Sequence, residues 1–383
     1  MTIGMLGFGE VAQAIFERIG EHWELSIKRI LSPAPRAGAG ERFTDNADDI
    51  LRDSEIDAVI DALEGGQPSL DYAMRALKAG KHVVSLNGEM LAAHLKELMD
   101  TAQRSRVQLK VEPAVGVGAP YLSNLIRLSR VDALRCVFGT ASGACNLILD
   151  AMQSDGIDMV DALGQAQRAG RADADPSRDV DGLDSRDKLS MAASVAFGLY
   201  VPPESIDVFG IRSITREDVR VIRRLGYVCR LLMRADQLVD NRISACVEPT
   251  LLRPGEPEAT VRFDNNLLGC VGHYTGEQYF FGPGRNPRAA AASAVLCLKD
   301  ILRGTLPLEE HIPHGSAVVD NTAAVHRYYV RTDARLSIPA ERLRGGGNHN
   351  LYLTMPLSVS RMHSLAAFLR LRDPNLFFAG VRG

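Results

Sequence analysis

The sequence has little of what marks a membrane protein or a nucleic-acid-binding protein. Its 383 residues include one tryptophan and only 6% aromatic residues. No apolar run is as long as the stretch of about 18 residues that a helix needs to cross a bilayer. Lysine and arginine (44) nearly balance aspartate and glutamate (47), and a net charge of −3 attracts neither nucleic acid nor an anionic membrane. We therefore expect a small-molecule substrate, with no nucleic acid and no membrane as partner.

Cysteine is also scarce, with six residues and no C-x-x-C pair. Their apolar surroundings predict buried, reduced thiols, and a zinc site or disulfides are the alternative. The first residues, "MTIGMLGFG", contain no basic leader and no cleavage site, so we expect no signal peptide. These features predict a cytoplasmic location.

The apolar pattern divides the chain into three parts. Residues 1–113 alternate short apolar runs with helical patterns, as a parallel βαβ sheet requires. Residues 114–287 mix helical and extended segments, and the alanine-rich helix 288–304 is expected to pack back on the first domain. Residues 305–383 form a weaker C-terminal extension. The expected fold class is α/β, with an N-terminal Rossmann-type dinucleotide-binding domain followed by an α+β domain for catalysis and assembly.

The clearest motif is the glycine loop "GFGEVA", which fits G-x-G-x-x-A between an expected strand and an expected helix. The first glycine permits a tight turn, the second lets the backbone approach a pyrophosphate, and the small third residue lets helix and strand pack closely. An ordinary tight turn is the alternative. The predicted nucleotide contacts are Gly7, Gly9, Glu10, Val11 and Ala12.

The end of the second expected strand bears on the choice of cofactor. NAD-binding domains usually carry an acidic residue there, which holds the ribose hydroxyls. This chain has Ser32 and Arg36 instead. A hydroxyl and a guanidinium suit a 2′-phosphate, so we predict NADP, with NAD as the alternative if Arg36 is an ordinary exposed arginine.

The densest polar stretch, residues 171–198, contains six aspartates and one lysine, Lys188. Asp184 and Lys188 stand four residues apart and would share a helix face, with Asp184 as the expected N-cap. A surface ion pair is the simplest interpretation. However, the helix continues as the small, apolar "LSMAASVAFG", so Lys188 can also face inward. A buried lysine beside a carboxylate can transfer a proton in alcohol–carbonyl chemistry.

Several blocks of the chain resemble the homoserine dehydrogenase family. The resemblance covers roughly residues 1–304 and rests on "GFGEVA", "KVEPAVGVGAP", "GTASGACNLILDAMQSDG", "ALGQAQRAGRADADPSRDVDGLDSRDKL" and "NNLLGCVGHYTGEQYFFGPGRNP". It implies an NAD(P)-dependent oxidoreductase that interconverts L-homoserine and L-aspartate 4-semialdehyde. It also implies a homodimer, formed through the α+β domain.

The resemblance assigns roles to individual residues. Lys188 would be the acid–base group, and Asp184 would position the substrate or its proton. The implied substrate-site residues also include Asp173, in place of the family's usual glutamate, with Asp179, Glu64 and Gly143. The implied site for a structural Na⁺ or K⁺ consists of Glu112 and the backbone carbonyls of Val115, Val117 and Ala119. A late turn with Gly282 and Gly284 would close over the cofactor.

The chain also departs from the family pattern. The usual T-A-N-K loop appears as Ser85-Leu86-Asn87-Gly88, so the charge of its lysine is missing. We expect Ser85 and Asn87 to keep a role at the nicotinamide ribose, while proton transfer falls to Lys188. Glu64 stands where the family prefers glycine, and two threonines of N-G-T-T-N are replaced by Ala144 and Cys145. The tail resembles a regulatory ACT module only as a degenerate remnant.

Three functions are compatible with these features. The first is hydride transfer between a nicotinamide cofactor and homoserine or its aldehyde. The second is the same chemistry on another amino alcohol in a specialised pathway, because the altered loop changes the charge of the pocket. The third is a non-catalytic NADP-binding protein, against which the retention of both Asp184 and Lys188 argues.

Overall fold

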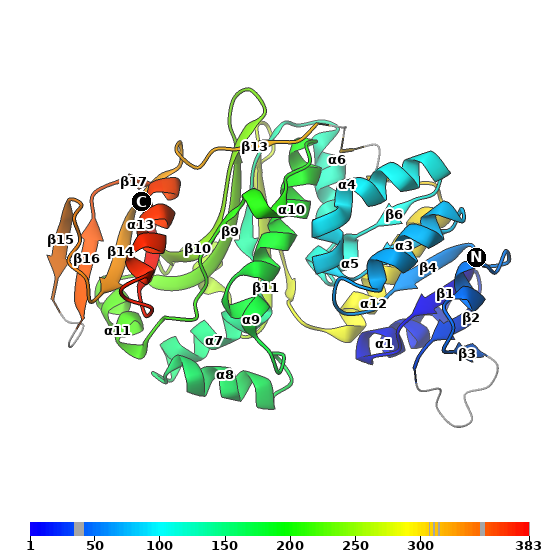
Figure 1. The fold of residues 1–383 in the computed structure, drawn as a ribbon, viewed down its shortest axis with the longest axis horizontal. Coiled ribbons are helices and arrows are strands. Elements are labelled where there is room, and N and C mark those ends of the chain that lie inside the picture. The colour runs from blue at the N-terminus through cyan, green and yellow to red at the C-terminus, as the bar shows by residue number, and fades with distance from the viewer. Residues whose placement is uncertain (34–41, 306, 309–310, 313–314, 345–348, 383) are drawn as a thin grey trace. The chain divides into compact units, whose positions relative to one another are not determined.

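The computed structural model describes residues 1–33, 42–305, 307–308, 311–312, 315–344 and 349–382. The chain divides into two compact units, whose residues can be found in Figure 1 by the colour bar, which runs from the N-terminus to the C-terminus. Unit 1 comprises Met1–Ala133, Ser190–Pro202 and Asn286–Ser316. Unit 2 comprises Leu134–Leu189, Pro203–Arg285 and Ala317–Gly383.

Unit 1 is built on a six-stranded parallel sheet with the strand order β3-β2-β1-β4-β5-β6. The strands are β1 (Thr2–Leu6), β2 (Ser26–Leu31), β3 (Phe43–Thr44), β4 (Ala58–Asp61), β5 (His82–Ser85) and β6 (Leu109–Lys110). The helices that follow them are α1 (Glu10–Ile19), α2 (Asp48–Leu51), α3 (Ser69–Lys78), α4 (Gly88–Ser105), α5 (Glu112–Gly116) and α6 (Tyr121–Ser129). This order is that of a Rossmann-type sheet. It confirms the predicted fold class.

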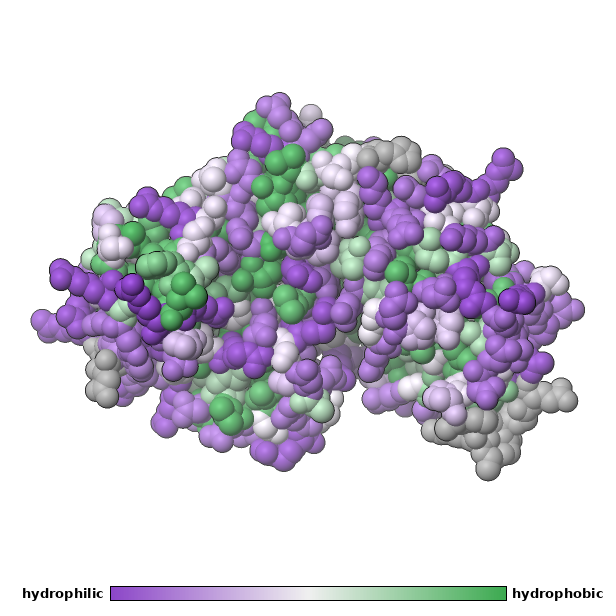
Figure 2. Space-filling model, viewed as in Figure 1, coloured by the Kyte–Doolittle hydropathy of each residue, from purple (hydrophilic) through white to green (hydrophobic). Residues whose placement is uncertain are grey.

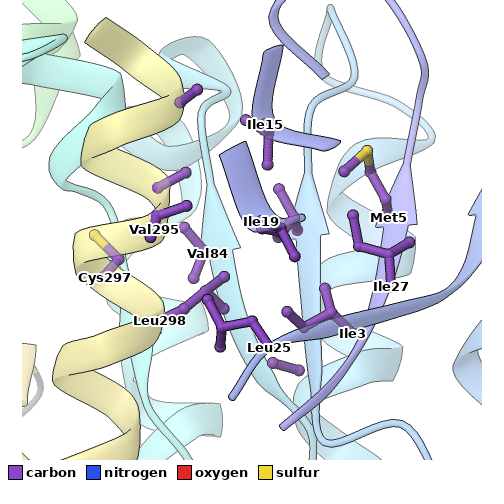
Figure 3. Close-up of a cluster of buried hydrophobic side chains, with 14 of the residues drawn as sticks. Ile3, Met5, Ile15, Ile19, Leu25, Ile27, Val84, Val295, Cys297 and Leu298 are labelled. Atoms are coloured by element: carbon purple, nitrogen blue, oxygen red, sulfur yellow. The ribbon is translucent and has the colours of Figure 1, made fainter. Parts of the chain in front are cut away.

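The core of unit 1 joins the first strands to a helix from much later in the chain. Ile3 and Met5 of β1 are fully buried in a cluster with α1 and with α12 (Pro287–Leu302) (Figure 3). Helix α12 contributes Ala291, Ala294 and Leu298, whose spacing of three and four residues places them on one face. The alanines let α12 approach α1 closely, because they carry almost no side-chain bulk.

Unit 2 is built on a large mixed sheet with the main strand order β12-β11-β7-β9-β10-β18-β14-β16-β15. The strands of this order are β7 (Leu134–Thr140), β9 (Val228–Gln237), β10 (Arg242–Leu252), β11 (Asn265–Gly272), β12 (Gly276–Pro283), β14 (Val325–Thr332), β15 (Ala340–Leu343), β16 (Asn350–Thr354) and β18 (Phe377–Val381). Three short strands pair at its sides, namely β8 (Asp207–Val208), β13 (Val318–Val319) and β17 (Leu357–Ser358).

The helices of unit 2 are α7 (Gly143–Ser154), α8 (Met159–Arg168), α9 (Ser177–Val180), α11 (Arg216–Arg224) and α13 (Val359–Arg370), with the first turns of α10 (Leu183–Phe197). Helices α7 and α11 both pack on β9. Helix α10 begins at Leu183, so Asp184 lies in its first turn. The prediction that Asp184 is the N-cap is therefore wrong by two positions, because the turn at Gly182, with φ of +84°, already starts the helix.

The C-terminal extension continues the sheet of unit 2. Strand β18 pairs with β10 in parallel and with β14 in antiparallel orientation, so residues from Ala317 onward belong to the same compact unit. Between β14 and β15 the described residues contain no helix. The ACT-like origin of this segment stays a prediction.

Candidate active site

The glycine loop connects β1 to α1. Gly7 has a φ of +91°, and a Cβ there would lie 2.9 Å from the carbonyl oxygen of Ala62. Both facts restrict this position to glycine. Gly9 is the N-cap of α1 with no side-chain cap, and a Cβ there would meet nothing within 4 Å. The first N–H groups of α1, from Glu10 onward, therefore face open space that an anionic phosphate can fill.

Of the other predicted nucleotide-site residues named here, three lie in the described part of the chain and one lies outside it. Ala12 is buried, as close packing of helix and strand requires, and Val11 is half-buried beside it. Ser32 directly follows β2, and its N–H donates to the carbonyl of Thr44 at 2.9 Å. Arg36 lies outside the described residues.

Sequence reasoning missed Asp61, which organises the loop after β5. Its buried carboxylate accepts hydrogen bonds from the hydroxyls of Ser85 at 2.7 Å and Ser69 at 2.6 Å. Burial raises the pKa of Asp61 above its usual value, and the two hydroxyls partly oppose that shift. The aspartate at the end of the apolar run "IDAVID" was the available signal. The hydroxyl of Ser85 is thus directed into the unit, at Asp61.

Asn87 also has a structural partner. Its side-chain oxygen accepts from the N–H of Met90 and caps α4, and its amide donates to the carbonyl of Gly65 at 2.6 Å. This bond links the loop to the exposed segment that carries Glu64. Gly88 has ordinary backbone geometry, and a Cβ there would lie 3.7 Å from the carbonyl of Ala114, an ordinary contact. The backbone at position 88 therefore accepts a Cβ without strain.

In unit 2, Lys188 and Asp184 form the pair that their spacing predicts. The Nζ of Lys188 lies 2.7 Å from Oδ2 of Asp184 and donates to the carbonyl of Ala141 at 2.9 Å. The lysine side chain is 11% exposed, so it faces inward and the surface-pair interpretation is wrong. Burial lowers the pKa of Lys188, but the attraction and hydrogen bond of Asp184 outweigh burial and leave the pKa raised.

A second carboxylate belongs to the same cluster. Asp179 accepts a hydrogen bond from Ser142 at 2.8 Å, and its carbonyl accepts one from the thiol of Cys145 at 3.2 Å. Burial raises the pKa of Asp179, and the negative charge of Asp184 adds to that shift. Ser142 and Cys145 thus hold Asp179 beside the Lys188 pair. The thiol of Cys145 is buried, like the other five, and all six cysteines are free, as predicted.

Gly143 and Gly284 lie together at the N-terminus of α7. A Cβ on Gly143 would lie 2.7 Å from the carbonyl of Asp264 and 3.3 Å from Cα of Gly284. Gly282 pairs with Asn266 in the hairpin of β11 and β12. Asn266 was missed by sequence reasoning: its amide donates to the carbonyl of Ala141 at 3.0 Å, the same carbonyl that Lys188 binds.

Asp173 stands apart from this buried cluster. Its side chain is 58% exposed and forms an ion pair at 2.7 Å with Arg285, two residues before α12 begins. Arg171 donates to the carbonyl of Arg285 at 3.0 Å and pairs with Asp264. The negative charge of Asp173 is therefore balanced by the positive charge of Arg285.

The predicted cation loop lies in unit 1. The Glu112 carboxylate is buried and accepts from the N–H of Leu122 at 3.0 Å and from the N–H and hydroxyl of Ser123. A carboxylate has about four acceptor positions, so it can also contact an ion. Val117 has a φ of 54°, a strained conformation for a β-branched residue. In the described residues no group of three or more His, Cys, Asp or Glu side chains forms a metal site, so any ion here depends on backbone carbonyls.

Comparisons with known proteins agree on one family. The model of the homoserine dehydrogenase NAD-binding domain matches residues 7–112, and the model of homoserine dehydrogenase matches residues 120–302. The homoserine dehydrogenase of Corynebacterium glutamicum is 34% identical over 311 residues, which cover 77% of this chain and 70% of that protein. Both of the family-model matches lie within the range over which the sequence resembles this family.

Solved structures give the same result. A homoserine dehydrogenase from Thiobacillus denitrificans superposes with a TM-score of 0.88 at 26% identity, covering 100% of this chain and 98% of the other. A hyperthermophilic archaeal homoserine dehydrogenase in complex with NADPH shares the fold, with a TM-score of 0.70 at 21% identity over 80% of this chain and 99% of the other. None of the helices in the described part of the chain is long and apolar enough to span a bilayer.

Proposed function

The chain belongs to the homoserine dehydrogenase family, and from this premise we propose that it oxidises L-homoserine, or reduces L-aspartate 4-semialdehyde, with NADP(H). The observation that carries the proposal is the ion pair, at 2.7 Å, between the buried Lys188 and the partly exposed Asp184. The bound dinucleotide supplies or accepts the hydride, while the protein supplies orientation and the proton.

The proton role of Lys188 follows from its partners. An ammonium group has three N–H donors, and two of them are directed at Asp184 and the carbonyl of Ala141. The third can donate to the oxygen of a bound aldehyde as it becomes an alkoxide. Since the raised pKa keeps Lys188 protonated near neutral pH, it acts as the acid in reduction. In oxidation it would take up the hydroxyl proton, after first losing its own.

For the substrate side, we propose that Asp179 and Asp184 bind polar groups of the amino alcohol, with Gly143 leaving room beside α7. Glu64 and Asp173 would contribute negative charge, although Asp173 is already paired with Arg285. The missing lysine at Gly88 removes a positive charge from the loop. A related amino alcohol in a specialised pathway is therefore the second candidate substrate.

The glycine loop supports the cofactor proposal, with phosphates at Gly7, Gly9, Glu10, Val11 and Ala12. We propose a preference for NADP through Ser32 and Arg36, because neither is a carboxylate. We further propose that Ser85 and Asn87 act by shaping the ribose-binding loop, and that Gly282 and Gly284 shape the turn that contacts the cofactor. A binding titration of NADPH against NADH tests the preference directly.

A monovalent cation and a second subunit complete the proposal. Na⁺ or K⁺ would bind Glu112 and the carbonyls of Val115, Val117 and Ala119, a set of hard oxygen ligands. Tyr279 and Phe281 alternate along β12 onto one face and are 38% and 60% exposed. We propose that this face contacts a second copy of the chain in a homodimer.

One experiment tests the central activity: NADP⁺ reduction followed at 340 nm with L-homoserine, and NADPH oxidation with aspartate semialdehyde. Turnover with both would support the homoserine reaction. If NADPH binds but neither substrate is converted, the protein has another substrate or none, and amino alcohols should be screened. In that case Gly88→Lys, which restores the missing charge at a position where a Cβ makes only ordinary contacts, should also restore homoserine turnover.

A further inference from the structure

Unit 2 contains a cavity of about 520 Å³ outside the cluster around Lys188. Its wall combines the link between α9 and α10, the segment after β8, and the C-terminal end of α13. The lining residues used below are Asp181, Leu183, Phe209, Arg212, Arg370 and Pro374. We call it the Arg370 cavity.

Two arginines in this cavity have unequal partners. Arg212 forms a two-point ion pair with Asp181, with its Nε 2.6 Å from Oδ1 and its Nη2 2.8 Å from Oδ2. Each oxygen of Asp181 thus accepts one hydrogen bond from Arg212. Arg370 forms no ion pair within the part of the chain that the structure describes, and its guanidinium lies 4.3 Å from the centroid of the Phe209 ring.

Asp181 is the one carboxylate among the described residues that line this cavity, and its hydrogen bonds go to Arg212, so the charge of Arg370 is only partly balanced. Arg370 is an exposed residue; burial lowers its pKa, the charge of Asp181 opposes that shift, and a guanidinium stays charged at any physiological pH. Two guanidiniums and one carboxylate give the cavity a net charge of about +1, counted from ionised side chains. One face of the Arg370 guanidinium lies against the Phe209 ring, and the exposed residue leaves the edge of the guanidinium accessible to an anion.

The rest of the wall is apolar. Leu183, Phe209 and Pro374 line the cavity, and Phe209 is only 3% exposed. Apolar surface also gathers over α13 in the view of Figure 2, outside the lining of the cavity. An anion with a purely polar body would leave the apolar wall of the cavity in water, whereas one with an apolar body would cover it.

We propose that the Arg370 cavity binds a small organic anion whose carboxylate or phosphate pairs with Arg370 and whose apolar body contacts Leu183 and Pro374. The planar guanidinium can donate two parallel hydrogen bonds to either head group. The stacked Phe209 ring holds that guanidinium in place, which reduces the entropy lost on binding.

The cavity shares its wall with the candidate active site. Asp181 stands between Asp179 and Asp184, and a Cβ on Gly210 would lie 2.0 Å from the carbonyl of Val180, so this link is packed tightly. A ligand that fills the cavity or draws Arg212 from Asp181 will shift the link. We therefore expect occupancy to change the rate of the reaction, a consequence that rests on the proposed function.

Binding itself is tested independently of activity, by isothermal titration calorimetry on the full chain. The probes are 3-methylbutanoate, isobutyl phosphate and the uncharged 3-methylbutanamide. We expect binding of at least one anion and none of the amide, and the stronger anion identifies the head group. Arg370→Gln should weaken binding by about ten- to a hundred-fold, since it removes a charge-assisted contact. Arg372→Gln, whose guanidinium lies over Phe368 and does not line the cavity, should bind as the parent does.

Three results would overturn the proposal: equal binding of the amide, unchanged binding by Arg370→Gln, or no binding of either anion. A thermal unfolding scan of both variants shows that each is folded. If the parent protein has full dehydrogenase turnover but binds neither anion, the proposal for the Arg370 cavity is refuted and the proposed function stands. Anion binding without turnover on any amino alcohol would refute the proposed function alone.

Discussion

At the scale of single residues, Lys188 shows how two opposed effects set one pKa. Burial favours the neutral amine, and the neighbouring carboxylate of Asp184 favours the ammonium more strongly. The result is a protonated lysine in a nearly dry place. A general acid needs both properties: a proton to give, and little water to compete for the substrate oxygen.

Replacing Lys188 by Met keeps an unbranched side chain, one atom shorter, and removes the proton donor. We expect kcat to fall by about 10²- to 10⁴-fold, the usual contribution of general acid–base catalysis. The dissociation constant of NADPH should stay the same, because the glycine loop is unchanged. The matched control is Lys78→Met at the exposed end of α3, which should have normal turnover. Equal kcat in the Lys188 variant and its parent would remove Lys188 from the mechanism.

Replacing Asp184 by Asn should move the pH profile. In the parent, aldehyde reduction slows as pH rises through the raised pKa of Lys188, because the acid loses its proton. The variant lacks the charge that raises this pKa, so burial lowers it and the decline begins at lower pH. The measurement is kcat for reduction at saturating substrate across the alkaline range. An unchanged alkaline limb would mean that another group controls the proton.

Sequence reasoning at this scale identified Lys188 and Asp184, because helical spacing fixes which side chains share a face. It did not identify the partners of Ser85, Asn87 and Asp61. A hydroxyl or amide has many potential partners within reach, and only the folded loop selects one. Asn266 was missed for the same reason, since it meets the carbonyl of Ala141 across a distant strand.

At the scale of elements, the connection from β1 to α1 depends on one glycine. Gly7→Ala introduces a Cβ 2.9 Å from the carbonyl of Ala62 at a φ of +91°. The strain costs about 1–3 kcal/mol. We expect a shift of the loop and at least about ten-fold weaker NADPH binding, measured by fluorescence titration.

The control for this variant separates a general effect of backbone strain on stability from a specific effect on the phosphate-binding loop. Gly80 also has a positive φ, +76°, but a Cβ there meets nothing within 4 Å, and it follows α3 rather than preceding α1. Gly80→Ala should lower the melting temperature and leave NADPH affinity unchanged. If both variants bind NADPH equally well, the geometry of Gly7 is not what prepares the phosphate site.

Helix α12 illustrates what a pattern can predict about an element. Its alanine-rich sequence predicts a helix over 288–304 that packs back on the first domain, and α12 lies in the core of unit 1 in one cluster with α1. Leu298 is fully buried there. Leu298→Ala should therefore reduce the free energy of unfolding by about 2–5 kcal/mol, measured by urea denaturation. Leu302→Ala, at a position 46% exposed on the same helix, should change it far less.

At the scale of the whole molecule, alternation of strands and helices was sufficient to predict the parallel sheet of unit 1. The organisation of unit 2 was harder to predict, because antiparallel pairing joins segments far apart in the chain. The pairing of β18 with β10 and β14 is an example, because the strand sequence "FFAGV" contains no signal that identifies its neighbouring strands. Strand pairing depends on the complete set of available edges, and a local pattern does not contain it.

The homodimer is the prediction that belongs to this scale. The chain has a mass of 41.6 kDa, so light scattering after gel filtration should give twice that value. Phe281→Arg places a charge on the exposed aromatic face of β12 and should shift the mass toward one chain, because an unpaired charge is costly to bury in an interface. Phe368→Arg, an equally drastic change at a 55% exposed position of α13, should leave the dimer intact. A parent protein with the mass of one chain would contradict the predicted dimer. If the Phe281→Arg variant is still a dimer, the interface does not include the aromatic face of β12.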